Sequence, residues 1–90
     1  MTKAELVAAM AEKAGMNRVQ AKEALDAFIA SVIEALREGE DVRVVGFGAF
    51  RSIHKPAGMA RNPKTGATVR KPARRTCRFQ AGDGLKSSLN

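Results

Sequence analysis

The segment from Arg51 to Thr76 most constrains the fold, because it lacks the side chains from which a hydrophobic core is built. It contains only three large apolar residues: Ile53, Met59 and Val69. Pro56 and Pro72 lack backbone N–H donors, and proline within a strand is typical of sheet edges. Neither a helix nor a sheet layer could bury itself against such a segment. We therefore expect it to project from the body of the protein.

A turn in the middle of this segment predicts how it folds. The stretch RNPKTG, Arg61–Gly66, has proline at the second position of NPKTG and glycine near its end, which is a turn signal. The simplest geometry folds residues 51–61 back against 68–78 as a two-stranded ribbon. About ten residues at roughly 3.3 Å each give a reach of about 30 Å. An isolated ribbon is marginally stable in water, so we expect it to be mobile until it binds something.

The charge of the chain is divided between its two halves. Residues 1–40 contain five Lys or Arg and seven Asp or Glu, whereas residues 41–90 contain eleven and two, within a net charge of +7. No acidic residue lies between Asp41 and Asp83, but ten cations do: Arg43, Arg51, Lys55, Arg61, Lys64, Arg70, Lys71, Arg74, Arg75 and Arg78. Surfaces that serve solubility alone usually mix both signs. The second half is therefore predicted to bind a polyanion.

The first half predicts two helices. Thr2 and Glu5 fit a capping box at the start of a helix that runs to about Ala14 and ends at Gly15. Asn17, with Gln20 three residues later, predicts the cap of a second helix that ends near Gly39. Its apolar residues form a stripe too wide for one short neighbouring helix to cover: Ala21, Ala24, Leu25, Phe28, Ile29, Val32, Ile33 and Leu36.

After the second helix, DVRVVGFGAFRSI has the β-branched and aromatic pattern of a short strand that turns at Gly46–Gly48 into a longer one. The Gly-x-Gly element is not a phosphate-binding loop, because the third glycine and the Gly-Lys-Ser/Thr ending are missing.

Without the ribbon, about 65 residues remain for the body, which is near the lower limit for a self-sufficient core. Dimerisation would solve this problem by burying the apolar face of the second helix together with phenylalanines of the sheet. Strand or helix spacing makes all four aromatic residues core candidates: Phe28, Phe47, Phe50 and Phe79.

Four motifs occur in one order along the chain: VGFGAF, RNPKTG in the basic hairpin, PARR, and AGDGLK. In this combination, across essentially all 90 residues, the chain resembles the bacterial histone-like proteins of the HU and integration host factor family. The resemblance implies an α+β fold: an intertwined dimer with a helical base, a small antiparallel sheet and a long two-stranded β-arm per subunit. The whole chain would be one domain, with a body of about residues 1–50 and 77–90 and an arm of about 51–76.

The resemblance also implies a DNA site. HU and integration host factor are standard examples of proteins that wedge an apolar side chain between base pairs from the minor groove, and here that side chain would be Pro63. Proline suits this role because its ring is compact and its φ is fixed. Arg61 and Asn62 would lie in the groove beside it. The expected phosphate contacts are the ribbon cations and two residues of the body: Arg51, Lys55, Lys64, Arg70, Lys71, Arg74, Arg75, Arg78, Lys3 and Lys86.

The favoured interpretation is that the protein is not an enzyme and that it bends, wraps and compacts duplex DNA with little sequence preference. A sequence-preferring subunit like those of integration host factor and an RNA-binding or ribosomal protein remain alternatives, although RNA readers usually stack bases on exposed aromatics. One histidine, His54, and one cysteine, Cys77, provide no catalytic or metal cluster. We therefore expect no cofactor, no metal, no small-molecule substrate and no membrane partner.

The single cysteine fits a protein of a reducing cytoplasm, and the resemblance implies the bacterial nucleoid as its location there. Cys77 is expected to be a buried thiol. A homodimer is expected, and a heterodimer with a paralogue is possible. One departure from the family concerns Asp83, which stands where relatives often carry a cation. Its carboxylate is expected to cap the terminal helix.

Overall fold

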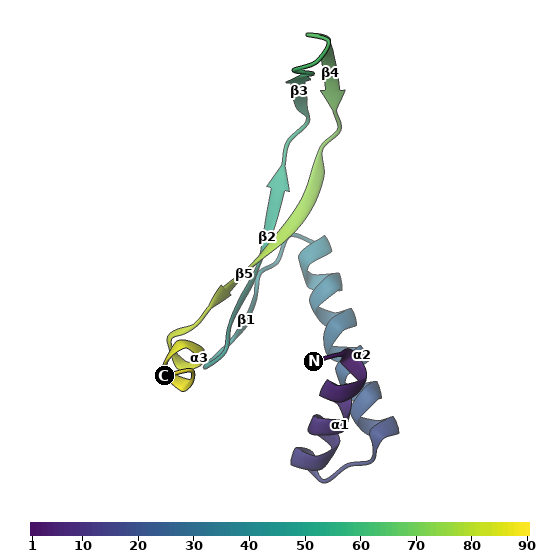
Figure 1. The fold of residues 1–90 in the computed structure, drawn as a ribbon, viewed down its shortest axis with the longest axis vertical. Coiled ribbons are helices and arrows are strands. Elements are labelled where there is room, and N and C mark those ends of the chain that lie inside the picture. The colour runs from purple at the N-terminus through teal and green to yellow at the C-terminus, as the bar shows by residue number, and fades with distance from the viewer. The chain divides into compact units, whose positions relative to one another are not determined.

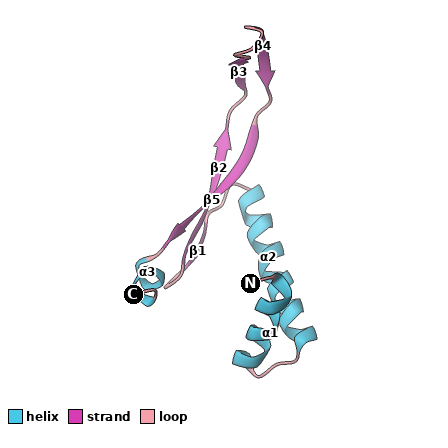
Figure 2. Ribbon diagram, in the orientation of Figure 1, coloured by secondary structure: helices cyan, strands magenta, loops and turns pink.

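The computed structural model describes residues 1–90, which form two compact units, Met1–Glu34 and Ala35–Asn90. The boundary lies within helix α2 (Arg18–Arg37). Figure 1 follows the chain from α1 (Lys3–Ala14) through five strands to the short helix α3 (Asp83–Ser88). Figure 2 shows that the first unit is entirely helical, and all five strands belong to the second. The predicted α+β class is confirmed.

Both helix starts are capped as the sequence predicts. At α1 the Thr2 hydroxyl accepts a hydrogen bond from the Glu5 amide at 3.2 Å, and Gly15 ends the helix in the left-handed conformation with φ 65°. At α2 the capping box is reciprocal. The Gln20 amide donates to Asn17 Oδ1 at 2.8 Å, and the Asn17 amide donates to Gln20 Oε1 at 3.2 Å. These bonds satisfy amides that have no partner within the helix.

The core of the first unit is small. Val7, Ala11 and Ala21 are buried, and partly buried methionine and leucine side chains pack against them. Farther along α2 only Val32 is buried, while Ile29 remains 39% exposed and Ile33 51% exposed. The wide apolar stripe of α2 is therefore not buried by a single chain.

The second unit is built on a three-stranded antiparallel sheet in the order β1-β2-β5, formed by β1 (Val42–Val44), β2 (Gly48–Lys55) and β5 (Arg74–Ala81). The predicted turn between the short and the long strand is confirmed. The Phe47 amide donates to the Val44 carbonyl at 3.0 Å, and Gly46 has φ 84°. The sheet register pairs Phe50 with Phe79, whose ring centroids lie 5.0 Å apart.

Two glycines allow backbone segments distant in sequence to approach closely. A Cβ atom at Gly48 would lie 2.6 Å from the Gln80 carbonyl oxygen and 2.7 Å from Cζ of Phe79. A Cβ atom at Gly84 would lie 2.7 Å from the Gly46 carbonyl oxygen. The motifs VGFGAF and AGDGLK thus contact each other through their backbones, which explains why both contain glycine at these positions.

The predicted ribbon is confirmed, but its ladder has a break. The outer strands β3 (Gly58–Arg61) and β4 (Thr68–Lys71) form a separate two-stranded sheet. The pairing of Arg51 with Arg78 and of Arg61 with Thr68 has the same register on both sides of the break. Pro56 and Pro72 lie in the break, one on each strand, where the missing N–H groups interrupt pairing.

Two local predictions are wrong. Cys77 is exposed, because the end of α2 meets this face of the sheet at Ser52 and Arg75 and leaves the thiol uncovered. The N-cap of α3 is Gly82, without a side-chain cap bond, and Asp83 is the first helical residue. Its carboxylate is near the positive end of the helix dipole, but it is not a cap. Phe28, Phe47 and Phe79, predicted to be core residues, remain 41–43% exposed in the single chain.

No helix is long and apolar enough to cross a membrane.

Candidate nucleic-acid interface

The strand register divides the ribbon cations between two faces. Side chains alternate between the faces along each strand, and directly paired residues share a face. Arg51 pairs with Arg78, Lys55 with Arg74, and Met59 with Arg70. Because these positions are separated by even steps on both strands, they lie on one face, which we call the cationic face. Its cations on β2 to β5 are Arg51, Lys55, Arg61, Arg70, Arg74 and Arg78.

Two pairs on the cationic face bring like charges directly opposite each other: Arg51 with Arg78, and Lys55 with Arg74. Directly opposed like charges destabilise a sheet. All four residues are exposed, and only Arg51 has an acidic neighbour, with its Nη1 4.0 Å from Oδ2 of Asp41. The face therefore carries repulsion that a bound polyanion would relieve.

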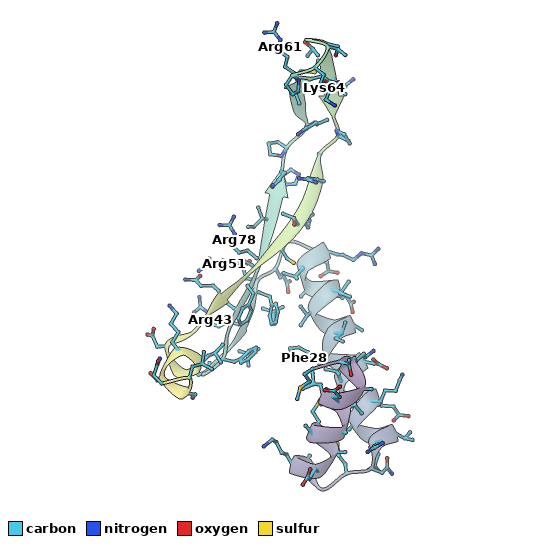
Figure 3. The ribbon with its side chains drawn as sticks, viewed as in Figure 1. Phe28, Arg43, Arg51, Arg61, Lys64 and Arg78 are labelled. Atoms are coloured by element: carbon cyan, nitrogen blue, oxygen red, sulfur yellow. The ribbon has the colours of Figure 1, made fainter.

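The cationic face extends onto the body of the second unit. Arg43 pairs with Ala49, two residues before Arg51 on the same face. Figure 3 shows Arg43, Arg51 and Arg78 on the same side of the sheet. Arg43 was not among the predicted site residues. Its strand is short, and only the register reveals which face it joins.

A hollow of about 400 Å³ lies at this end of the sheet and includes Arg43, Arg51 and Lys86 in its lining. Asp83 lines the same hollow, so its carboxylate lies among three cations. The structure thus brings the predicted site residue Lys86 together with the base of the cationic face.

The ribbon tip is a turn held by its own polar groups. The Asn62 amide donates to the Ala67 carbonyl at 2.8 Å, and the Gly66 amide donates to the Asn62 carbonyl at 2.7 Å. Oδ1 of Asn62 accepts from the Lys64 amide at 2.9 Å. Pro63 is exposed within this turn, and Figure 3 shows Arg61 and Lys64 at the far end of the ribbon. The side-chain oxygen of Asn62 thus shapes the turn and leaves its NH₂ group for a ligand.

Two predicted phosphate contacts, Lys71 and Arg75, lie on the face opposite the cationic face. Lys71 pairs with Gly58, and Arg75 pairs with His54. Arg75 is also engaged within the protein, since its Nη1 donates to Ser52 Oγ at 3.2 Å.

Lys3 belongs to the first unit, where it forms an ion pair. Its Nζ lies 2.7 Å from Oδ1 of Asp26, and Nζ of Lys22 lies 2.9 Å from Oδ2 of the same carboxylate. The hydrogen bonds from Lys22 and then Lys3 lower the pKa of Asp26 from 3.8 to about 2. The hydrogen bond to Asp26 likewise raises the pKa of Lys22 above 10.5.

No three His, Cys, Asp or Glu side chains come close enough together to hold a metal ion. The surface consists instead of separate exposed cations along a ribbon. Such a surface fits an extended polyanion, and it has none of the enclosed geometry that a small substrate requires.

Comparison with known proteins agrees with this class. The family model described as bacterial DNA-binding protein matches residues 1–90, and the chain belongs to that family. A relative named DNA-binding protein HU, from Caulobacter vibrioides, is 63% identical over 99% of this chain and 97% of its own length. Integration host factor subunit alpha from Bordetella avium is 43% identical over 99% of this chain and 77% of its own.

A solved structure described as an Anabaena HU–DNA cocrystal has a TM-score of 0.82 and 42% identity, and covers 99% of this chain and 97% of that chain. The resemblance inferred from the sequence is therefore confirmed. Membership of this family of DNA-binding proteins also confirms that the chain is not an enzyme.

Proposed function

We propose that the protein is an architectural DNA-binding protein of the HU type, which binds duplex DNA along the cationic face and bends it. The main observation behind the proposal is that two like-charged pairs lie on one face of an exposed ribbon. These cross-strand pairs are Arg51 with Arg78 and Lys55 with Arg74. Phosphates would replace this repulsion with attraction and release counterions from the duplex. The 63% identity to a protein named HU and the HU–DNA cocrystal neighbour support the same function.

Low sequence preference follows from the chemistry of the face. Its cations are suited to phosphates, which position a protein on DNA without conveying sequence. The HU relative is more similar than the integration host factor subunit, at 63% against 43% identity. This difference supports the HU-like function over the sequence-preferring alternative. Family membership also supports DNA, not RNA, as the ligand.

Pro63 is the proposed wedge between base pairs. It lies in an exposed turn whose backbone is held by hydrogen bonds on both sides, from Asn62 to Ala67 and from Gly66 to Asn62. A ring with fixed φ in such a turn loses little conformational entropy on binding. Unstacking a base step costs about a few kcal/mol, and the bent duplex offsets this by bringing more phosphates to the protein.

The active form is proposed to be a dimer, most simply a homodimer. The single chain leaves Ile29, Ile33, Phe47 and Phe79 between 39% and 51% exposed. Exposed apolar side chains of this size, present in both units, are unfavourable for a monomer and suit an interface with an identical subunit. A dimer would also provide two ribbons, which could hold one duplex from two sides. The proposed location is the nucleoid in the bacterial cytoplasm.

A binding panel tests this function. Linear, nicked and pre-bent duplexes and a duplex RNA of equal length are titrated by gel shift at several salt concentrations. We expect nicked and pre-bent DNA to bind most tightly, because part of the bending cost is already met. The slope of log Kobs against log salt concentration should be steep, at about −0.9 for each phosphate contact on duplex DNA. Equal affinity for RNA, or a slope near zero, would contradict the proposal.

A further inference from the structure

Arg74 and Arg75 are adjacent in sequence but differ in their surroundings. Arg74 pairs with Lys55 on the cationic face, and no hydrogen bond or ion pair within the chain holds its side chain. Arg75 pairs with His54 on the opposite face, and its guanidinium donates to Ser52 Oγ at 3.2 Å. In the sequence the two arginines look equivalent, but the sheet places them in different surroundings.

Ser52 connects Arg75 to the end of α2. Its hydroxyl donates to the Leu36 carbonyl at 2.8 Å, which is one of the carbonyls left without a helical partner in the last turn. Its amide donates to Oδ1 of Asp41 at 2.9 Å, just before β1. The amide and the hydroxyl of Ser52 thus both have partners at the end of α2 or just before β1. We call Leu36, Asp41, Ser52 and Arg75 the Ser52 network.

The guanidinium of Arg75 also lies against the turn that follows α2. A Cβ atom at Gly39 would lie 3.3 Å from Arg75 Nη1, so only glycine leaves room for the guanidinium without adjustment. Gly39 has φ 85°, and its amide donates to the Leu36 carbonyl at 3.1 Å. A cation at the carboxyl end of a helix is favourable because the helix dipole is negative there.

We propose that Arg75 is a positioning residue that fixes the base of the ribbon to the last turn of α2 and does not contact DNA phosphates. This inference deepens the proposed function and rests on it, because it separates the cations that bind DNA from the one that holds the ribbon. Ser52 acts with Arg75, as the hydroxyl that joins the guanidinium to the Leu36 carbonyl.

The first experiment compares Arg75→Gln with Arg74→Gln, a matched control one residue away on the other face. The salt dependence of binding to a nicked duplex is measured for both variants and the parent dimer. Arg74→Gln should make the slope of log Kobs against log salt less steep by about 1.8 for a symmetric dimer that loses two contacts. Arg75→Gln should leave the slope unchanged. An equal loss of slope in Arg75→Gln would overturn the proposal.

The second experiment needs no DNA. Hydrogen exchange is followed at the amides of Gly39, Glu40 and Ser52, whose bonds lie in or beside the network, and at Asn62 and Gly66 in the ribbon tip as internal controls. Arg75→Gln should speed exchange at the first group by about five-fold, the effect of losing one ordinary hydrogen bond. In Arg75→Gln, exchange at the two amides of the ribbon tip should stay unchanged. In the Arg74→Gln variant, all of these amides should exchange at the rates of the parent protein.

Ser52→Ala provides an independent check because it alters no charge. It should reproduce the exchange pattern of Arg75→Gln, and adding Arg75→Gln to it should produce little further change, because both remove the same connection. Additive effects of the two substitutions would contradict the network. If neither arginine variant changes the salt slope, the cationic face itself is wrongly assigned and the proposed function fails. The exchange result still decides whether Arg75 holds the ribbon base.

Discussion

The two compact units use charge in opposite ways. In Met1–Glu34, Asp26 accepts hydrogen bonds from both Lys3 and Lys22, so basic side chains are compensated within the unit. In Ala35–Asn90, the cationic face places Arg51 against Arg78 and Lys55 against Arg74. The one carboxylate close to these pairs is that of Asp41, 4.0 Å from Arg51. Paired charges of the first kind give modest stability. Opposed charges of the second kind reduce the stability of the free protein and favour the binding of a polyanion. The charges of the first unit therefore contribute to folding, and those of the second unit contribute to binding.

The largest effect is expected from removing one opposed pair. Arg51→Gln combined with Arg78→Gln should make the salt slope of DNA binding less steep by about 3.6 in a symmetric dimer, because four phosphate contacts are lost. The free protein should unfold at an equal or higher temperature, since the cross-strand repulsion is gone. Lys22→Gln in the first unit is the control and should leave the slope unchanged. Gel shifts across salt and thermal melts provide both readings, and an unchanged salt slope in the double variant would contradict the phosphate contacts.

Next in size is the effect of Gly48→Ala on stability. The new methyl group would clash with the Gln80 carbonyl and the Phe79 ring, and overpacking of this kind costs about 1–3 kcal/mol. Gly58→Ala is the matched control on the outer ribbon, where a Cβ atom meets nothing within 4 Å, and it should stay within about 0.5 kcal/mol. Denaturant unfolding measures both. Similar costs at the two sites would contradict the close backbone approach.

A narrower effect is expected from Pro63→Ala. The variant should keep its salt slope, because the cationic face is intact, but should bend DNA less and lose part of its preference for nicked and pre-bent duplexes. Fluorescence transfer between dyes on the two DNA ends measures the bend. Pro56→Ala, in the ladder break, is the control for a general effect of losing a ribbon proline. An unchanged bend in Pro63→Ala would exclude the wedge.

The smallest effect concerns the paired charges of the first unit. The pKa of Asp26 is about 2 in the folded protein, compared with an ordinary value of 3.8. Its contribution to stability is therefore complete above about pH 4 and is lost as the pH falls toward 2. Asp26→Asn should lack this part of the acid dependence, and added salt should weaken it in the parent because the groups are exposed. Melting temperatures at pH 2 to 6 provide the test. Identical acid profiles for parent and variant would show that the ion pairs contribute nothing.

Much of the fold could be predicted because its signals are local. Thr2, Asn17 and Gln20 form their caps with residues three positions away, and the turn at Pro63 forms within its own loop. Asp83 and Cys77 were predicted wrongly for different reasons. The cap of α3 depends on the backbone at Gly82. The exposure of Cys77 depends on which elements cover β5, and no local pattern contains that information.

The order of the elements, the ribbon and the basic character of its surface could be predicted from the residues alone, since turn residues, strand periodicity and charge act over short distances. The face that each cation occupies could not, because a face is set by the pairing register between strands far apart in the chain. Shifting that register by one residue would exchange Arg74 and Arg75 between the two faces. Register also explains why Arg43 joins the cationic face and why Arg75 turns instead to Ser52 and the end of α2.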